Sequence, residues 1–173
     1  MFFNEEQRFR QKLILLPIAF SGLVILVVLC AGLYSQMVLN KPFGNNPMSN
    51  KGLILAISII LLIYVAIFWL FNFTCLFTRI DREGITIRFR PFHRKPILVR
   101  WEEIESYEII KYNPIGDYGG WGLQSGRKGK AYNVSGNIGL QLILKNQKKI
   151  LIGTQNKEKM QNFFSSLEKR NQD

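Results

Sequence analysis

Histidine, cysteine and acidic residues are scarce in this sequence of 173 residues. It has one histidine, two cysteines and 12 Asp plus Glu against 23 Lys plus Arg, which gives a formal net charge of +11. Cys30 and Cys75 define neither a disulfide framework nor the spacing of a metal site. His93 lies in a basic segment without the partnered nucleophile that covalent catalysis needs. We therefore expect no enzyme, no catalytic residue, no metal and no cofactor.

Charge is missing altogether from two long stretches. Residues 13–39 and 53–71 contain no Asp, Glu, Lys or Arg. As a helix, at ~1.5 Å per residue, the first stretch reaches about 40 Å, more than the ~30 Å hydrocarbon core of a bilayer. Both stretches are apolar on all sides, so neither has a single stripe to bury against a soluble core. The sequence predicts two transmembrane helices, about 13–39 and 53–77, without the ionisable groups of an ion pathway.

Three other interpretations of the first stretch fit less well. A cleaved signal peptide has a shorter apolar core and a small-residue cleavage site, which Cys30-Ala31-Gly32 does not supply. A lipoprotein anchor at Cys30 needs a small residue before it, where Leu29 stands. A buried helix of a soluble protein would need a much larger protein around it. We therefore predict a helix that is retained in the membrane.

The segment between the stretches, Asn40 to Gly52, is rich in Asn, Gly and Pro and predicts a turn. The two helices then form an antiparallel hairpin, with both chain ends on one side of the membrane. The turn has two basic residues, Lys41 and Lys51, and the flanks have more, among them Arg8, Arg10, Lys12, Arg79, Arg82, Arg88 and Arg90. By the positive-inside rule, both termini are expected in the cytoplasm.

From Thr78 onward the pattern changes to short strands and one helix, with 18 Lys plus Arg against 10 Asp plus Glu. Alternating or β-branched runs predict strands at 85–89, 97–101, 106–112, 136–145 and 150–153. Asn156 precedes a predicted helix of about 14 residues. Its i, i+3, i+4, i+7 stripe consists of Met160, Phe163, Phe164 and Leu167. We expect residues 1–77 to form a flank and helical hairpin, and residues 78–173 to form an α+β domain.

Three segments of this domain are distinctive: IDREGITIRFRPF with VRWEEIESYEI, YGGWGLQSGRKGKAYNVSG, and LQLILKNQKKILIGTQNKEKM. Over about residues 74–169 the chain resembles the membrane-anchored bacterial pleckstrin-homology (PH)-like domains. The resemblance implies a seven-stranded, strongly bent antiparallel sheet or small barrel, capped by the C-terminal helix, with no catalytic reaction. The chain departs from the family pattern at Gln124, where an Arg is expected, and at Lys157, where a Pro often opens the helix.

Two groups of residues are candidates for binding. The first is a basic segment without acids that follows the second apolar stretch: Arg88, Arg90, Arg94, Lys95 and Arg100. Anionic headgroups attract such residues by ~1 kcal/mol each, so these are lipid-headgroup candidates. The alternative is a solvated loop whose charge only sets the topology.

The second group surrounds a glycine-rich loop and is a candidate for binding a protein partner: Tyr118, Trp121, Arg127, Lys128, Lys130 and Tyr132. The alternative is a Trp packed over a sheet corner. The loop lacks the spacing of a P-loop, and no nucleic-acid recognition motif is present. We expect a scaffold module that docks a protein partner, or a second copy, near anionic lipid. The alternative is an accessory subunit of a transporter or envelope complex, packing through helices in which Gly22 and Gly32 permit close contact.

Overall fold

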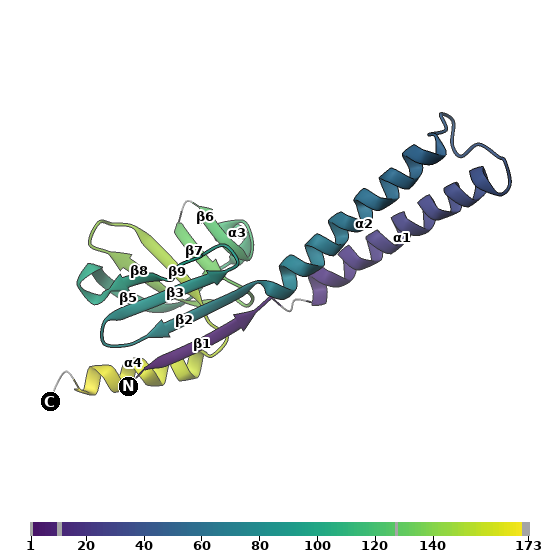
Figure 1. Cartoon of the computed structure of the whole chain (residues 1–173). Helices are drawn as coiled ribbons and strands as arrows, with labels where there is room; N and C mark the ends of the chain where they lie inside the picture. The colour runs from purple at the N-terminus through teal and green to yellow at the C-terminus, as the bar shows by residue number, and fades with distance from the viewer. Residues whose placement is uncertain (1, 10–11, 127, 171–173) are drawn as a thin grey trace. The chain divides into compact units, whose positions relative to one another are not determined.

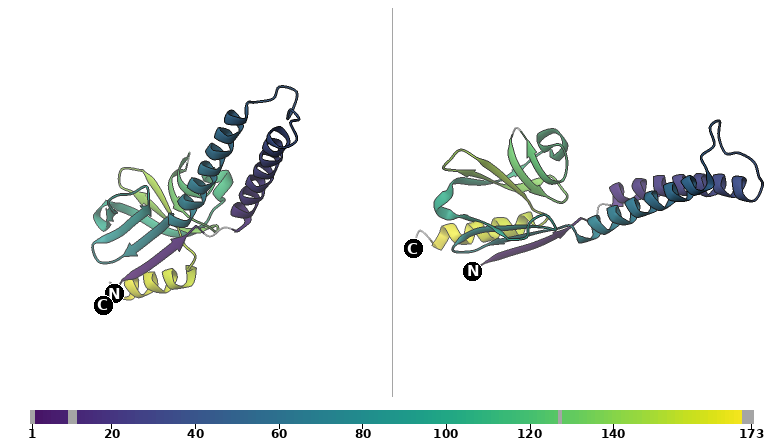
Figure 2. Two further views of the ribbon diagram at one scale, coloured as in Figure 1. Left: turned by 45° about the vertical axis from the view of Figure 1, so that its right-hand side comes forward. Right: turned by 45° about the horizontal axis from the view of Figure 1, so that its top comes forward.

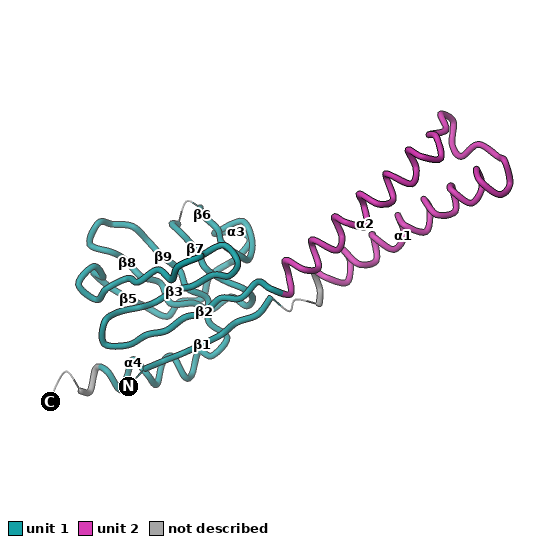
Figure 3. Tube along the Cα trace, in the orientation of Figure 1, with its two compact units in different colours: residues 1–9, 73–173 teal, residues 10–72 magenta. Residues whose placement is uncertain are grey.

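The computed structural model describes residues 2–9, 12–126 and 128–170, and the chain divides into two compact units. Unit 1 comprises Met1–Phe9 and Phe73–Asp173, and unit 2 comprises Arg10–Asn72 (Figure 3). The N-terminal residues therefore belong to the same unit as the C-terminal half, although the apolar stretches separate them in sequence.

Unit 2 consists of two long helices, α1 (Lys12–Met37) and α2 (Asn50–Phe73). Within them, Leu15–Met37 and Asn50–Phe73, of 23 and 24 residues, are long and apolar enough to cross a membrane. Only 11% and 6% of their most apolar windows are buried. The apolar side chains therefore lie mostly on the outside of the helix pair, unlike those of a core helix in a soluble protein.

The two helices of unit 2 contact each other through an aromatic ring set on a glycine. A Cβ atom added to Gly22 would lie 2.5 Å from Cε1 of Tyr64, so only glycine leaves room for this ring. The Tyr64 hydroxyl is 3.2 Å from the Ser21 hydroxyl. At Gly32 an added Cβ would lie 2.6 Å from the ring of Phe43, in the connecting segment. Both glycines are thus covered from within the hairpin.

Unit 1 contains a first, four-stranded sheet in the order β1-β2-β3-β4, antiparallel throughout (Figure 1). Its strands are β1 (Phe3–Arg8), β2 (Cys75–Ile80), β3 (Gly84–Arg90) and β4 (Ile97–Arg100). The sequence analysis predicted no strand among residues 3–8, yet β1 pairs with β2 along its whole length. The Phe9 N–H also donates to the Thr74 carbonyl at 3.2 Å.

A second sheet has five strands in the order β5-β8-β9-β7-β6. They are β5 (Ile104–Lys111), β6 (Gly122–Gly126), β7 (Gly129–Asn133), β8 (Ile138–Leu144) and β9 (Lys149–Gly153). The short helices η1 (Trp101–Glu103) and α3 (Pro114–Tyr118) precede β5 and β6. The five strands predicted between residues 85 and 153 are confirmed as β3, β4, β5, β8 and β9.

Two expectations about the sheets need correction. The expectation of wholly antiparallel pairing is wrong for β7 and β9, which run parallel. The chain reverses between β7 and β8 and again in the β8–β9 hairpin, so β9 returns in the direction of β7. The described residues form nine strands rather than seven, and no pairing among them closes a barrel.

The C-terminal helix α4 (Lys157–Arg170) joins the two sheets, as its predicted apolar stripe required. The Phe163 ring lies 6.1 Å from that of Phe3 in β1. The Phe164 ring stacks on Tyr107 of β5 at 4.7 Å, and Met160 is fully buried. Figure 2 shows α4 running beside β1 in both views. The core between the sheets is aliphatic, with fully buried Leu76, Ile80, Ile85, Ile87, Leu140, Leu142 and Ile152.

Candidate functional site

One end of the first sheet is connected directly to the helical hairpin through the chain. Strand β2 begins at Cys75, two residues after Phe73 ends α2. Cys75 pairs with Arg8 of β1 on one side and with Arg90 of β3 on the other. The row Arg8–Cys75–Arg90 therefore marks the end at which the chain passes between sheet and helices. We call it the linked end. The β3–β4 loop, residues 91–96, follows Arg90 and starts from this end.

The outer face of this sheet carries arginines at both of its ends. Arg8, Arg88 and Arg90 are at the linked end, whereas Arg100 pairs with Gly84 at the opposite end. Gly84 and Arg90 are six residue steps apart along β3, which is about 20 Å at ~3.4 Å per residue. This spacing exceeds two Debye lengths of ~8 Å at physiological ionic strength. Of the five lipid-headgroup candidates, four gather at the linked end and Arg100 lies apart.

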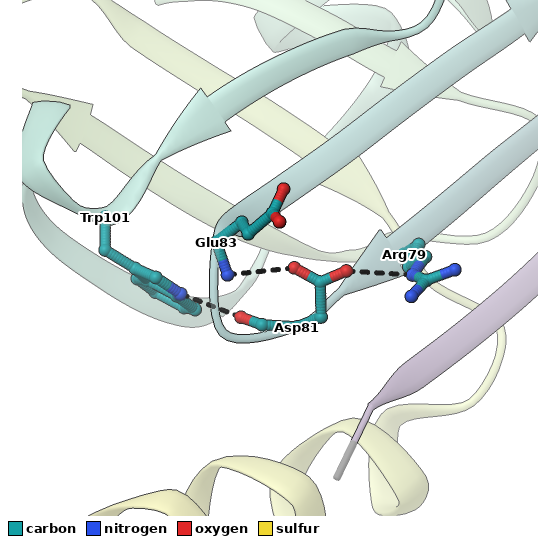
Figure 4. Close-up of polar contacts among 4 residues, drawn as sticks. All are labelled: Arg79, Asp81, Glu83 and Trp101. Atoms are coloured by element: carbon teal, nitrogen blue, oxygen red, sulfur yellow. Dashed lines mark hydrogen bonds and ion pairs between the residues drawn. The ribbon is translucent and has the colours of Figure 1, made fainter.

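Acidic groups accompany the basic ones at the far end of the sheet, in the β2–β3 turn. The Asp81 carboxylate accepts hydrogen bonds from Arg79 Nε at 2.9 Å and from the Glu83 N–H at 3.0 Å (Figure 4). Trp101 Nε1 donates to the Asp81 carbonyl at 2.8 Å and holds the turn against β4. The positive charge of this end is therefore partly balanced by neighbouring carboxylates.

The linked end has little such compensation. Within the part of the chain that the structure describes, no carboxylate lies within 4.0 Å of the charged groups of Arg88, Arg90, Arg94 or Lys95. Arg88 Nη2 donates to the Arg94 carbonyl at 3.2 Å. Glu6 pairs with Arg8 at 3.0 Å. The hydrogen bond from Arg8 lowers the pKa of Glu6, and the charges of Arg8 and Arg90 lower it further. Arg88 is half-buried, whereas Arg90, Arg94 and Lys95 are exposed and can meet an external anion.

The β3–β4 loop is held in a defined conformation. The His93 N–H donates to the Phe89 carbonyl at 2.7 Å, and the Phe89 N–H donates to His93 Nδ1 at 3.3 Å. The Phe92 ring lies 5.9 Å from the buried ring of Phe89, but 55% of Phe92 is exposed. The loop thus presents one aromatic side chain to the outside, between Arg90 on one side and Arg94 and Lys95 on the other.

His93 connects this loop to the second sheet. Its ring meets the ring of Tyr132 in β7 edge to face at 5.5 Å. Burial lowers the pKa of His93, and the positive charge of Lys130 lowers it further. A neutral ring at pH 7 suits Nδ1, which accepts the hydrogen bond from Phe89. Lys130, predicted as a partner-binding residue, is therefore a neighbour of the basic loop.

The other partner-binding candidates do not form one exposed surface. Tyr118 and Tyr132 are 5% and 3% exposed and belong to the core. Tyr118, the last residue of the short helix α3, packs with Tyr112, Ala131 and Leu151. These two rings are therefore not available to a docking protein.

The remaining candidates of this group have internal partners or lie outside the described residues. Trp121 is half-buried, and its Nε1 donates to the Gly136 carbonyl at 3.0 Å. Gln124, at the position where the resemblance implies an Arg, donates to the Trp121 carbonyl at 3.2 Å. Lys128 pairs with Asp117 at 2.8 Å, and this hydrogen bond lowers the pKa of Asp117. Arg127 lies outside the described residues.

Sequence reasoning missed two residues of the linked end. Arg8 counted only as a topological flank, because its place beside Cys75 depends on a strand pairing between distant segments. Phe92 had a visible signal, since a lone aromatic residue in a basic loop between Pro91 and Pro96 has no partner in its own segment. The described residues contain no group of three or more His, Cys, Asp or Glu that could hold a metal.

Comparison with family models, with curated proteins and with solved structures found no match for this chain. Its class follows from its architecture alone. It is an α+β protein in which a two-sheet unit is combined with two helices long and apolar enough to span a membrane. This combination fits a membrane-anchored layout.

Proposed function

We propose that this protein is a non-enzymatic, membrane-anchored binding module of the PH-like type, from a bacterial cytoplasmic membrane. Its linked end rests on anionic headgroups of the inner leaflet, and its other surfaces remain open to a protein partner. One observation carries the proposal: cations with little acidic compensation gather at the end of the sheet that continues into the apolar helices.

The chain limits how far this end can be from a bilayer that α2 crosses. Only Thr74 lies between Phe73 and Cys75, and an extended chain covers at most ~3.6 Å per residue, or about 7 Å here. The headgroup layer on one side of a bilayer is about 5–7 Å thick. The row that contains Arg8 and Arg90 is then at headgroup level. At ~1 kcal/mol for each basic residue, the four sequence-derived cations of this end would contribute about 4 kcal/mol before screening.

The pairing of β1 with β2 supports a hairpin that enters and leaves the membrane on one side. The residues just before α1 and just after α2 are neighbours in one sheet, as the 3.2 Å bond from the Phe9 N–H to the Thr74 carbonyl illustrates. Two spans that begin and end at one sheet support a common compartment for both termini. The excess of basic residues in the flanks supports the cytoplasm as this compartment.

The alternative, an accessory subunit that packs through its helices, has less support. Gly22 and Gly32 were the positions expected to admit a foreign helix, and the rings of Tyr64 and Phe43 cover them. A partner would have to bind other faces of α1 and α2, where larger apolar side chains are exposed. The proposal that unit 1 docks a protein partner has a separate basis. It rests on the resemblance of unit 1 to PH-like domains, which bind rather than catalyse.

Hydrogen exchange of the full-length protein in lipid nanodiscs tests the lipid contact. We expect residues 88–96 to exchange more slowly in discs of anionic lipid than in neutral discs, because headgroups cover the linked end and the β3–β4 loop. Arg90→Glu should reduce this difference, because it removes one attraction of ~1 kcal/mol and replaces it by a repulsion. Arg100→Glu, the same change on the same face at the far end, should preserve it. Salt at ~1 M, where the Debye length is ~3 Å, should weaken it in the wild type. Equal exchange in the two lipids, or equal effects of the two variants, would refute the proposal.

A further inference from the structure

The exposed aromatic ring of the β3–β4 loop has no role in the fold that explains its position. Phe92 is 55% exposed, and among the described residues its ring contacts that of Phe89, at 5.9 Å. The two bonds between Phe89 and His93 hold the loop backbone in place on either side of the ring. An apolar side chain fixed on the outside is suited to an apolar environment outside the protein.

We propose that the β3–β4 loop penetrates the headgroup layer and that the Phe92 ring lies at the boundary with the acyl chains. This inference rests on the proposed function, because the linked end must face the bilayer. The loop starts at Arg90, which pairs with Cys75 beside the start of the chain segment leading to α2. The register of β2 with β3 that puts the basic residues at the linked end also puts the β3–β4 loop there, and the proposed insertion of the loop rests on this register.

The chemistry of the loop matches an interfacial segment. Arg90, Arg94 and Lys95 flank the ring, and all three are exposed. Membrane-surface segments combine cations, which bind phosphates of anionic lipids, with aromatic rings that enter the boundary below. The cations also orient the loop, because only one arrangement satisfies both the phosphates and the ring. The occupant of this surface is therefore a bilayer that contains anionic lipid.

A second exposed phenylalanine of the same unit provides a matched control. Phe2 is 64% exposed and precedes Phe3, which pairs with Ile80 at the far end of the sheet. The Arg79 guanidinium lies over its ring, 5.7 Å from the centroid. Phe2 and Phe92 thus share residue type and degree of exposure and differ in the end of the sheet from which they project.

Photocrosslinking in proteoliposomes tests the insertion. Full-length protein is prepared with p-benzoylphenylalanine in place of Phe92 or of Phe2, in vesicles of mixed anionic and neutral phospholipid. Mass spectrometry of the labelled peptides then counts adducts on acyl chains. We expect roughly a five- to tenfold excess of acyl adducts at position 92, since burying half of a Phe side chain is worth ~1–1.5 kcal/mol.

The outcomes separate this inference from the proposed function. Equal acyl adducts at the two positions, while Arg90→Glu still reduces the lipid-dependent exchange difference, would overturn the insertion and leave the headgroup contact intact. Equal acyl adducts at the two positions together with equal hydrogen exchange in anionic and neutral discs would overturn both the insertion and the headgroup contact. Adducts at position 92 that join it to a protein chain instead of lipid would overturn the insertion and identify the loop as a protein-docking surface.

Discussion

Glu5 and Glu6 are adjacent carboxylates on opposite faces of β1, and the structure predicts very different costs for their removal. Glu5 is 4% exposed and points into unit 1. Its Oε2 accepts a hydrogen bond from the Thr154 hydroxyl at 2.7 Å, and its Oε1 accepts one from the Gln155 N–H at 2.7 Å. Asn156 Nδ2 donates to the same oxygen at 3.2 Å. Glu5→Ala would leave these donors at the start of α4 without their acceptor.

The loss of stability caused by Glu5→Ala depends on how deeply each of the three donors is buried. Asn156 is exposed and can bind water instead, so its loss costs little. The Thr154 hydroxyl is buried and the Gln155 N–H partly so, and each loses a charge-assisted hydrogen bond worth ~1.5–3 kcal/mol. Relief of the desolvation of a buried carboxylate offsets part of this sum. We expect Glu5→Ala to destabilise the junction of β1 and α4 by about 3 kcal/mol.

Hydrogen exchange of the full-length protein in nanodiscs measures this junction directly. Under conditions where exchange reports the opening equilibrium, 3 kcal/mol corresponds to about 100-fold faster exchange in residues 3–8 and 154–160. Glu6→Ala is the matched control. The Glu6 side chain is 51% exposed, pairs with Arg8 on the surface and is hydrogen-bonded to Cys75, and such exposed contacts add little stability. Equal acceleration in the two variants would refute the assignment of Glu5 as the buried acceptor.

Two further predictions concern positions with close neighbours. Gly22→Leu places atoms where the Tyr64 ring now lies, so overpacking should destabilise the helical hairpin by ~1–3 kcal/mol. A denaturation midpoint in SDS, followed by circular dichroism, should fall, and an unchanged midpoint would contradict this packing. His93 has a folded-state pKa below its ordinary value of 6.5, so the unfolded chain binds the proton more readily. Stability from this group is full above pH 6.5 and is lost as the pH falls toward the folded-state pKa. His93→Asn keeps an acceptor for the Phe89 N–H and should reduce this loss. An unchanged pH profile of unfolding would contradict it.

Elements with local signals were predictable from the sequence. The two uncharged stretches gave α1 and α2, because length and composition alone decide whether a helix suits a membrane. The stripe of α4 placed Met160, Phe163 and Phe164 in the core, because a period of 3.6 residues defines one face of a helix. Five strands followed from alternation between turns. In each case the information lies within about twenty neighbouring residues.

Strand β1 was not predictable by such signals. Its inward positions are Phe3, Glu5 and Gln7, of which only the first is apolar. Glu5 and Gln7 can be buried because their partners come from the end of β9 and the residues after it, as in the 2.6 Å bond from Gln7 Nε2 to the Gly153 carbonyl. A polar side chain is stable inside a protein only where it has a hydrogen-bond partner. A sequence pattern does not reveal a partner almost 150 positions away.

The candidate site was predictable in composition and not in geometry. The sequence analysis grouped Arg90 with Arg100, since only nine positions separate them in the chain. The antiparallel hairpin of β3 and β4 sends them to opposite ends of the sheet, because Arg100 pairs with Gly84 at the start of β3. Tyr118 and Tyr132 suggested a surface because they flank a glycine-rich loop. The fold buries Tyr118 in a cluster at the end of α3 and buries Tyr132 against His93.

The two connections between the sheet and the helical hairpin bear on how strong a lipid contact has to be. A domain on a single flexible linker samples a large volume, and each surface contact must pay the full entropy of positioning. Here the chain leaves the sheet after Phe9 and returns to it at Thr74, and these two residues are hydrogen-bonded to each other. A double connection restricts rotation more than one linker does. Under the proposed function, contacts of ~1 kcal/mol each at Arg90 and its neighbours would suffice to hold the linked end on an anionic surface, without a pocket for one lipid. Replacing β1 pairing by a free N-terminal segment should therefore weaken the lipid contact even with every basic residue of β3 and its loop in place.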